Sequence, residues 1–318
     1  MYAFLLNGSN VNLAKEEIFA LSDLKKCVLD ERIMLIDKKF DFSRLSYTHK
    51  VYQLIEIIKD IKEIGNINLQ RYYKNSFRVR LIRISDDLGK DCHEKSIGSM
   101  IWGTLKNPKV ELNNPETKFS IIFTKKNIYV CLEIMDLDKT EMRLRDSKFR
   151  PGLHPSTMNS LFARALVNLS CVNKNELFMD PFCGVGGILL EAGSLKCKLI
   201  AYDINPYIIE KCKKNLEHYK IKNFKVEVKN ALEVKDKVDA IATDLPYGRH
   251  SSLHGMKIED LYNKFTERAC LMLKKKKRLV IVMPSTINLN YKGFTLKAEI
   301  LKRIHKGLTR KILVLEKN

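Results

Sequence analysis

The chain has 318 residues, of which 45% are apolar, enough to build the cores of two domains, and this excludes a disordered protein. The formal net charge of +20, from 57 basic and 37 acidic residues, favours a polyanionic partner, nucleic acid above all. A lysine-rich proteome would give the same charge. No apolar run approaches the roughly 18 residues of a membrane span, so we expect no membrane partner.

The eight cysteines are far apart in the sequence and show no CxxC spacing. Neither a zinc site nor a disulfide framework is supported, and we expect no bound metal. Free thiols in mostly apolar surroundings are typical of a reducing cytosol. Residues 1–8 predict a strand instead of a signal peptide. The sequence therefore favours a cytoplasmic protein.

The N-terminal part predicts an α+β region. Residues 2–6 and 32–36 have the composition of strands, and between them residues 13–26 carry apolar side chains at helical spacing. A second unit is expected to contain helices over 52–63 and 94–105, strands over 77–83, 119–123 and 128–132, and a hairpin turn over 124–127.

The character of the chain changes at residue 138. Residues 138–155 are charged and rich in turn formers, which predicts a linker. After the linker, strands and helices alternate as in a mostly parallel, doubly wound sheet, so we expect a Rossmann-like α/β domain. Its strands are expected at residues 176–179, 199–202, 224–228, 238–243, 278–283 and 312–315.

A glycine-rich loop, Asp180 to Gly187, follows the first strand of this domain, and a helix is expected from Ile188 to Leu195. Glycines let the backbone approach a ligand closely, and the acidic residue that opens the loop suits a cation better than a diphosphate. Asp203 ends the second strand, where a carboxylate commonly binds ribose hydroxyls. The pattern favours S-adenosylmethionine, with contacts expected from Asp180, Pro181, Phe182, Gly184, Gly186, Asp203, Ile204, Asn230 and Ala231.

The motif Asp244-Leu245-Pro246-Tyr247-Gly248 follows the fourth strand. The Asp244 carboxylate and the Leu245 carbonyl can accept both hydrogen bonds of an exocyclic amine, and Pro246 fixes the backbone between them. The Tyr247 ring can stack on the base that carries the amine. We therefore predict that Asp244, Leu245, Pro246 and Tyr247 are catalytic, and that Asp244 also borders the donor.

Two further features leave alternatives open. The basic run Lys274 to Arg278 predicts either an RNA-binding patch or a solvated loop between a helix and a strand. His250 and His254 flank the loop after the tyrosine, and a mobile loop over the substrate fits them better than a metal pair.

The chain resembles THUMP-containing RNA guanine-N2 methyltransferases, above all the archaeal branch that modifies guanosine at position ten of tRNA. The resemblance covers nearly the whole chain. Two positions depart from the family pattern: Leu245 replaces a proline, and Asn230 stands where an acidic residue is usual. The motifs that carry the resemblance are residues 94–99, 109–116, 150–158, 180–187, 244–248 and 303–311, together with Asp203.

The resemblance implies a ferredoxin-like subdomain (1–46), a THUMP domain (47–137), a linker (138–155) and a methyltransferase domain (156–318). The substrate would be the N2 amine of a guanosine in tRNA, and the products N2-methyl- and N2,N2-dimethylguanosine. A small activating subunit and a monomer both stay open. The resemblance adds His154 and Pro155 to the donor site. Arg78 and Arg80 alternate on an expected strand, which favours RNA contact. Further RNA contacts are expected from Lys95, Arg145, Lys148, Arg150 and Arg249.

Three other functions stay open on the sequence. They are N2 methylation at another tRNA or rRNA site, adenine-N6 methylation of DNA, and RNA binding without catalysis. An Asp-x-Pro-Tyr motif handles adenine amines equally well, but the N-terminal unit argues against DNA. The complete donor and acceptor motifs argue against a catalytically silent protein.

Overall fold

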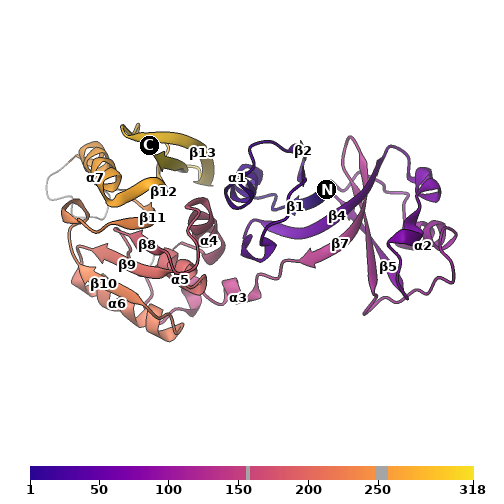
Figure 1. The fold of residues 1–318 in the computed structure, drawn as a ribbon, viewed down its shortest axis with the longest axis horizontal. Coiled ribbons are helices and arrows are strands. Elements are labelled where there is room, and N and C mark those ends of the chain that lie inside the picture. Colours follow the sequence, from indigo (N-terminus) through magenta and orange to yellow (C-terminus); the bar gives the residue numbers. More distant parts are fainter. Residues whose placement is uncertain (155–157, 248–256) are drawn as a thin grey trace. The chain divides into compact units, whose positions relative to one another are not determined.

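The computed structural model describes residues 1–154, 158–247 and 257–318. These residues form two compact units (Figure 1). The first unit contains residues 1–11, 24–43 and 48–138, and the second contains residues 12–23, 44–47 and 139–318. Across the described ranges, no helix combines the length and apolarity needed to cross a membrane.

The first unit is built on one seven-stranded sheet, in the order β2-β3-β1-β4-β7-β6-β5. All neighbouring strands are antiparallel except β5 and β6, which run parallel. The main helix of this unit is α2 (Glu94–Trp102), and its buried face packs into the core under β5 and β6. The strands are β1 (Tyr2–Leu6), β2 (Val28–Asp30), β3 (Ile33–Ile36), β4 (Thr48–Ile58), β5 (Phe77–Arg83), β6 (Thr117–Phe123) and β7 (Ile128–Asp136).

The helix expected over residues 52–63 is wrong, because β4 occupies most of that range and a short 3-10 helix (Ile61–Asn66) follows it. The segment is rich in isoleucine, and β4 pairs with β1 on one side and β7 on the other, so tertiary pairing decides its conformation. Strands from residues 1–46 and from residues 47–137 share this sheet. The division into two N-terminal subdomains therefore stays a prediction.

The second unit contains a mixed sheet in the order β10-β9-β8-β11-β12-β14-β13. The strands from β10 to β12 run parallel, and β14 is antiparallel to both β12 and β13. This confirms the predicted α/β fold with its C-terminal doubly wound sheet. Its strands are β8 (Leu177–Asp180), β9 (Lys198–Asp203), β10 (Phe224–Val228), β11 (Val238–Asp244), β12 (Leu273–Pro284), β13 (Phe294–His305) and β14 (Leu308–Lys317), and its longer helices are α4 (Ser160–Leu169), α5 (Gly187–Ser194), α6 (Pro206–His218) and α7 (Ile258–Met272).

The basic run at residues 274–278 lies inside β12, which begins at Leu273, so the expected loop is wrong. The Lys274 ammonium lies 2.7 Å from an Asp239 carboxylate oxygen, and Lys277 pairs with Glu176. These ion pairs with residues at the start of β8 and in β11 hold the run against the sheet. Part of its charge is therefore already neutralised.

Helix α1 (Val11–Ser22) and residues 44–47 belong to the second unit, although they come early in the sequence. The buried Glu17 carboxylate accepts hydrogen bonds from the backbone N–H groups of Ser46 and Tyr47 and from the Asn168 amide on α4. Arg44 donates to the Asn168 side chain and to the Val172 carbonyl. Figure 1 draws α1, in indigo, beside α4.

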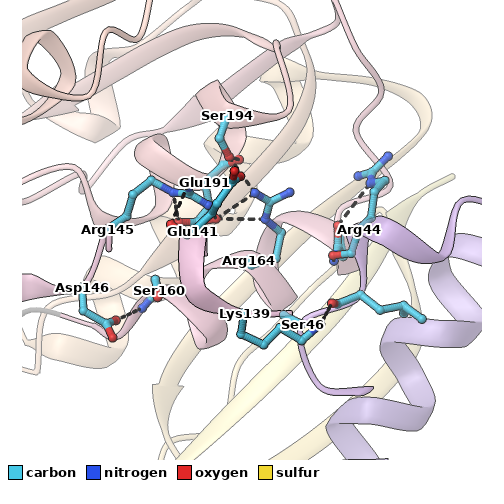
Figure 2. Close-up of polar contacts among 12 residues, drawn as sticks. Arg44, Ser46, Lys139, Glu141, Arg145, Asp146, Ser160, Arg164, Glu191 and Ser194 are labelled. Carbon is cyan, nitrogen blue, oxygen red and sulfur yellow. Dashed lines mark hydrogen bonds and ion pairs between the residues drawn. The ribbon is translucent and has the colours of Figure 1, made fainter. Parts of the chain in front are cut away.

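The expected linker is folded over part of its length. It contains the one-turn helix α3 (Thr140–Arg143) and a 3-10 turn (Ser147–Phe149). The Glu191 carboxylate on α5 is buried between the guanidinium groups of Arg145 (2.7 Å) and Arg164 (2.9 Å), as Figure 2 shows. The backbone N–H of Ser160 donates to Asp146 at 2.7 Å. These contacts fix the end of the linker to α4 and α5.

Candidate active site

Asp180 and Asp244 end two neighbouring parallel strands, β8 and β11. The strand order changes direction between them, since β9 and β10 lie on one side and β12 on the other. Open α/β sheets bind ligands at this point, beyond the carboxyl ends of the strands. A cavity of about 1280 Å³ is found there. Ten of the predicted site residues line it: His154, Asp180, Phe182, Gly184, Asp203, Ile204, Asp244, Leu245, Pro246 and Tyr247.

The Asp180 carboxyl group is almost fully buried at the floor of this cavity, with 2% of its surface exposed. Its Oδ1 accepts a hydrogen bond from the Thr243 hydroxyl at 2.7 Å and one from the Phe182 backbone N–H at 3.3 Å. Burial raises the pKa of Asp180 to about 7, because it disfavours the charged form more than these hydrogen bonds favour it. A cationic ligand would favour the ionised form.

The loop after β8 is shaped by two glycines with positive φ, Gly184 (+50°) and Gly186 (+84°). A side chain at Gly186 would collide with the Cys212 sulfur at 2.8 Å, whereas no heavy atom lies within 4 Å of the corresponding position at Gly184. The Gly184 N–H donates to one Asp203 oxygen (3.1 Å) and the Asn205 N–H to the other (3.0 Å). The loop thus presents backbone and an oriented carboxylate to the cavity.

The Asp244 carboxylate is held by two side chains. The Tyr247 hydroxyl donates to Oδ1 at 2.8 Å, and an Arg310 guanidinium nitrogen lies 3.5 Å from Oδ2. The same guanidinium lies 5.5 Å from the centre of the Tyr247 ring. Burial raises the pKa of Asp244, and the Arg310 charge and the Tyr247 hydrogen bond oppose that rise. The result is an oriented carboxylate that binds a proton more readily than one in water.

The backbone between Asp244 and Tyr247 is fixed from both sides. The Leu245 N–H donates to the Val282 carbonyl on β12 at 3.0 Å, and the Tyr262 hydroxyl on α7 donates to the Pro246 carbonyl at 2.8 Å. Leu245 therefore needs no proline ring to hold its position. The departure from the family pattern at this residue is offset by β12.

Some predicted donor contacts lie elsewhere in the second unit. Asn230 caps a 3-10 turn (Ala231–Glu233) by accepting from the Leu232 N–H, and neither it nor Ala231 lines the cavity. Pro181 is buried, and Gly186 precedes α5. The donor contacts of these four residues stay predictions. Pro155, Gly248, Arg249, His250 and His254 lie outside the described residues.

The predicted RNA contacts divide into inward-facing and exposed side chains. Arg145 is engaged with Glu191, and Arg150, which is 3% exposed, donates to the Arg145 carbonyl. Burial lowers the pKa of Arg150. Both guanidinium groups thus have partners inside the second unit, and RNA binding by Arg145 and Arg150 stays a prediction.

The other four cationic side chains differ in how they are engaged. Guanidinium groups of Arg78 and Arg80 lie 3.8 Å from Glu133 and 2.9 Å from Glu94. Lys95 and Lys148 are exposed. RNA binding by these four residues stays a prediction.

Sequence reasoning missed Arg310, which pairs with Asp244, and Thr243, which donates to Asp180. The available signal was the basic segment 303–311, which is one of the motifs that carry the family resemblance. Which residues face this segment across the sheet depends on the order of the strands. In the described parts of the chain, no group of three or more His, Cys, Asp or Glu side chains is arranged to hold a metal.

Comparison with protein families gives two matches. A model described as an RMKL-like methyltransferase domain matches residues 147–312. This range includes every strand from β8 to β12. A model described as a DNA methylase matches residues 4–214, a range that ends before Asp244. Only the first match therefore contains both the donor loop and the acceptor motif.

Curated relatives cover most of the chain. A protein named tRNA (guanine(10)-N2)-dimethyltransferase from Methanothermobacter thermautotrophicus is 31% identical over 86% of this chain and 84% of its own length. One of the same name from Pyrococcus abyssi is 28% identical over 99% of both chains. The crystal structure of TrmN from Thermus thermophilus, 17% identical, aligns with a TM-score of 0.53 over 100% of this chain and 99% of that one, which supports the fold.

Proposed function

Because the chain belongs to the family of tRNA (guanine(10)-N2)-dimethyltransferases, we propose that it methylates the exocyclic N2 amine of the guanosine at position ten of tRNA. The first transfer would give N2-methylguanosine and a second would give N2,N2-dimethylguanosine. The observation that carries the proposal is the meeting of Asp180 and Asp244 at the switch point of the sheet, in one cavity. A donor loop and an acceptor for an amine thus face the same space.

The residues of the cavity fit S-adenosylmethionine as the methyl donor. Asp180, Asp203 and Asp244 supply three carboxyl groups toward a ligand that carries an ammonium and a sulfonium. The open space at Gly184 allows close approach of the ligand to the backbone. Asp203, oriented by two N–H donors, has lone pairs left for ribose hydroxyls. When bound, the donor supplies an electrophilic methyl group.

The acceptor side would orient and activate the amine. The Asp244 carboxylate and the Leu245 carbonyl would each accept a hydrogen bond from one N–H of the guanine amine. These two hydrogen bonds would draw electron density onto N2 and aim its lone pair at the methyl carbon. The nitrogen must lose a proton after the transfer. The raised pKa of Asp244 makes this carboxylate a suitable acceptor for that proton.

The base would have to leave its helical stack to reach Asp244, at a cost of a few kcal/mol. In the free protein the Tyr247 hydroxyl donates a hydrogen bond to Asp244. To stack on the base, the tyrosine would have to give up this hydrogen bond. We further propose that the first unit, which resembles a THUMP region, binds the tRNA.

The decisive experiment incubates the full-length protein with labelled S-adenosylmethionine and unmodified tRNA, rRNA or DNA, followed by nucleoside analysis. We expect label in N2-methylguanosine from tRNA. The matched substrate carries inosine at position ten, which lacks only the N2 amine and should accept no label. Label in N6-methyladenine from DNA, or equal labelling of the inosine tRNA, would overturn the proposal.

A further inference from the structure

The tip of the β13–β14 hairpin, residues 302–310, is strongly basic and is called the basic tip below. The segment from Ile300 to Leu315 contains no acidic residue. Arg303, His305 and Lys306 are exposed. Five residues of the tip line the active-site cavity: His305, Gly307, Leu308, Thr309 and Arg310. Positive charge therefore lies on the rim of the space into which we place the guanosine.

Two cations of the tip are opposed across the hairpin. Lys302 and Arg310 are direct cross-strand partners. Like charges in this position destabilise a sheet, because their side chains leave on the same face at short distance. Burial and the Arg310 charge both lower the pKa of Lys302. The Asp244 carboxylate, 3.5 Å from Arg310, offsets only part of this repulsion, because it does not pair with Lys302.

The surroundings of Lys302 do not neutralise it. Its ammonium lies 3.3 Å from the Tyr47 hydroxyl, 5.5 Å from the centre of the Tyr47 ring and 5.2 Å from that of Phe162. These groups are uncharged. Among the described residues, none of the ion pairs includes Lys302. An anion bound at the tip would relieve the repulsion between Lys302 and Arg310.

We propose that the basic tip binds backbone phosphates of the RNA strand that carries the target guanosine. The inference rests on the proposed function. A base in the cavity is joined through its sugar to a phosphate on each side, so the strand must pass over the rim. Lysine and arginine side chains bind phosphate through charge-assisted hydrogen bonds, and such contacts fix register without reading sequence.

The test uses full-length variants and unmodified tRNA, with affinity measured by fluorescence anisotropy across a series of salt concentrations. The double variant Arg303→Gln/Lys306→Gln removes two exposed charges of the tip. Its matched control, Lys214→Gln/Lys222→Gln, removes two exposed lysines of the same unit that do not line the cavity. Lys302→Met keeps an apolar stem over the two rings while it removes the opposed charge.

We expect the tip double variant to bind tRNA roughly fivefold more weakly at physiological salt and to lower the slope of log affinity against log salt by about one unit per residue. The control pair should change both values less. Lys302→Met should weaken tRNA binding yet melt at or above the wild-type temperature. All variants should bind S-adenosylhomocysteine with wild-type affinity.

The proposal is overturned if both double variants lose the same affinity, because net charge alone then explains the loss. An unchanged salt slope in the tip variant also overturns it, because the tip then contacts no phosphate of the tRNA. These outcomes differ from a failure of the proposed function, in which the wild-type protein itself would not methylate tRNA.

Discussion

Asp244 accepts a hydrogen bond from the Tyr247 hydroxyl and forms an ion pair with Arg310, and in the proposed reaction it would also accept a hydrogen bond from the substrate amine. Asp244→Asn removes the negative charge and places an NH2 group toward an amine in one of its two orientations. We expect single-turnover methylation of tRNA to fall about a hundredfold or more, the scale of one preorganised electrostatic group. Donor affinity should change little. A rate near that of the wild type would contradict the assigned role.

Arg310 should set the pH range in which Asp244 is ionised. Asp180 on β8, Tyr247, Tyr262 on α7 and Arg310 surround this carboxylate, and Arg310 is the cation among them. Arg310→Met removes a charge that lowers the pKa of Asp244, so that pKa should rise further. Less carboxylate is then present at neutral pH, and the acid limb of the rate profile should move to higher pH.

Partial rescue of Arg310→Met at alkaline pH, with tRNA at saturating concentration, would separate this effect from a loss of folding. Arg310→Lys keeps the charge and should shift the profile less. If the methionine variant loses activity equally at every pH, Arg310 does not act through the charge of Asp244.

Asp180 should make donor binding depend on pH. Its pKa of about 7 in the free protein means that a large share is protonated below neutrality. A cationic donor favours the carboxylate, so binding should release a proton, and affinity should rise between pH 6 and pH 8. Calorimetry in buffers of different ionisation enthalpy measures that proton directly. Asp180→Asn should bind more weakly without this pH dependence, and a persisting pH dependence would assign it to another group.

At the scale of elements, Glu191 joins the linker to the helix that carries the donor loop. Its carboxylate is fully buried between two guanidinium groups from the linker and α4. Glu191→Gln leaves those two charges without their partner, and we expect a loss of about 3–5 kcal/mol in the free energy of unfolding, measured by urea titration. Glu210→Gln breaks an exposed pair with Lys213 and should cost under about 1 kcal/mol. If both variants lose the same free energy of unfolding, the buried cluster contributes no more to stability than an exposed ion pair.

The strands with a parallel neighbour on each side were predictable because each reads as a short apolar run with turn formers at its ends. β4 and β13 were not. β4 mixes isoleucines with charges in a pattern that a helix could share, and its sheet partners decide the conformation. β13 is an edge strand in which exposed and basic residues interrupt the apolar alternation after Ile300, and no strand is expected there from the sequence.

Most of the predicted donor and acceptor residues lie around one cavity because they follow strand ends, and strand ends converge in this class of sheet. The Asp244 contacts of Arg310 were not predictable, since they depend on the antiparallel return of β14 beside β12. The inward turn of Arg145 depends likewise on the position of Glu191. Side-chain pairing between distant elements leaves no periodic signal in the sequence.

At the scale of the whole molecule, the catalytic unit is not a contiguous segment. Residues 12–23 and 44–47 belong to it, and Glu17 and Tyr47 contribute buried groups to it. The second compact unit therefore includes buried residues outside 156–318, and the bounds expected for the methyltransferase domain stay a prediction. A division of labour in which the first unit binds tRNA cannot be tested simply by cutting the chain at the linker.

A fragment of residues 139–318 should consequently be less stable than the same unit in the full chain. Without α1 and residues 44–47, the fully buried Asn168 amide loses its bonds to Glu17 and to the Arg44 carbonyl, and the α4 face beneath them meets water. Apolar surface that is returned to water costs about 25 cal/mol per Å². We expect a lower melting temperature and weaker S-adenosylhomocysteine binding.

Glu17→Ala in the full chain should also lower the melting temperature. A fragment that melts at the same temperature as the intact protein would show that the N-terminal segment adds no stability.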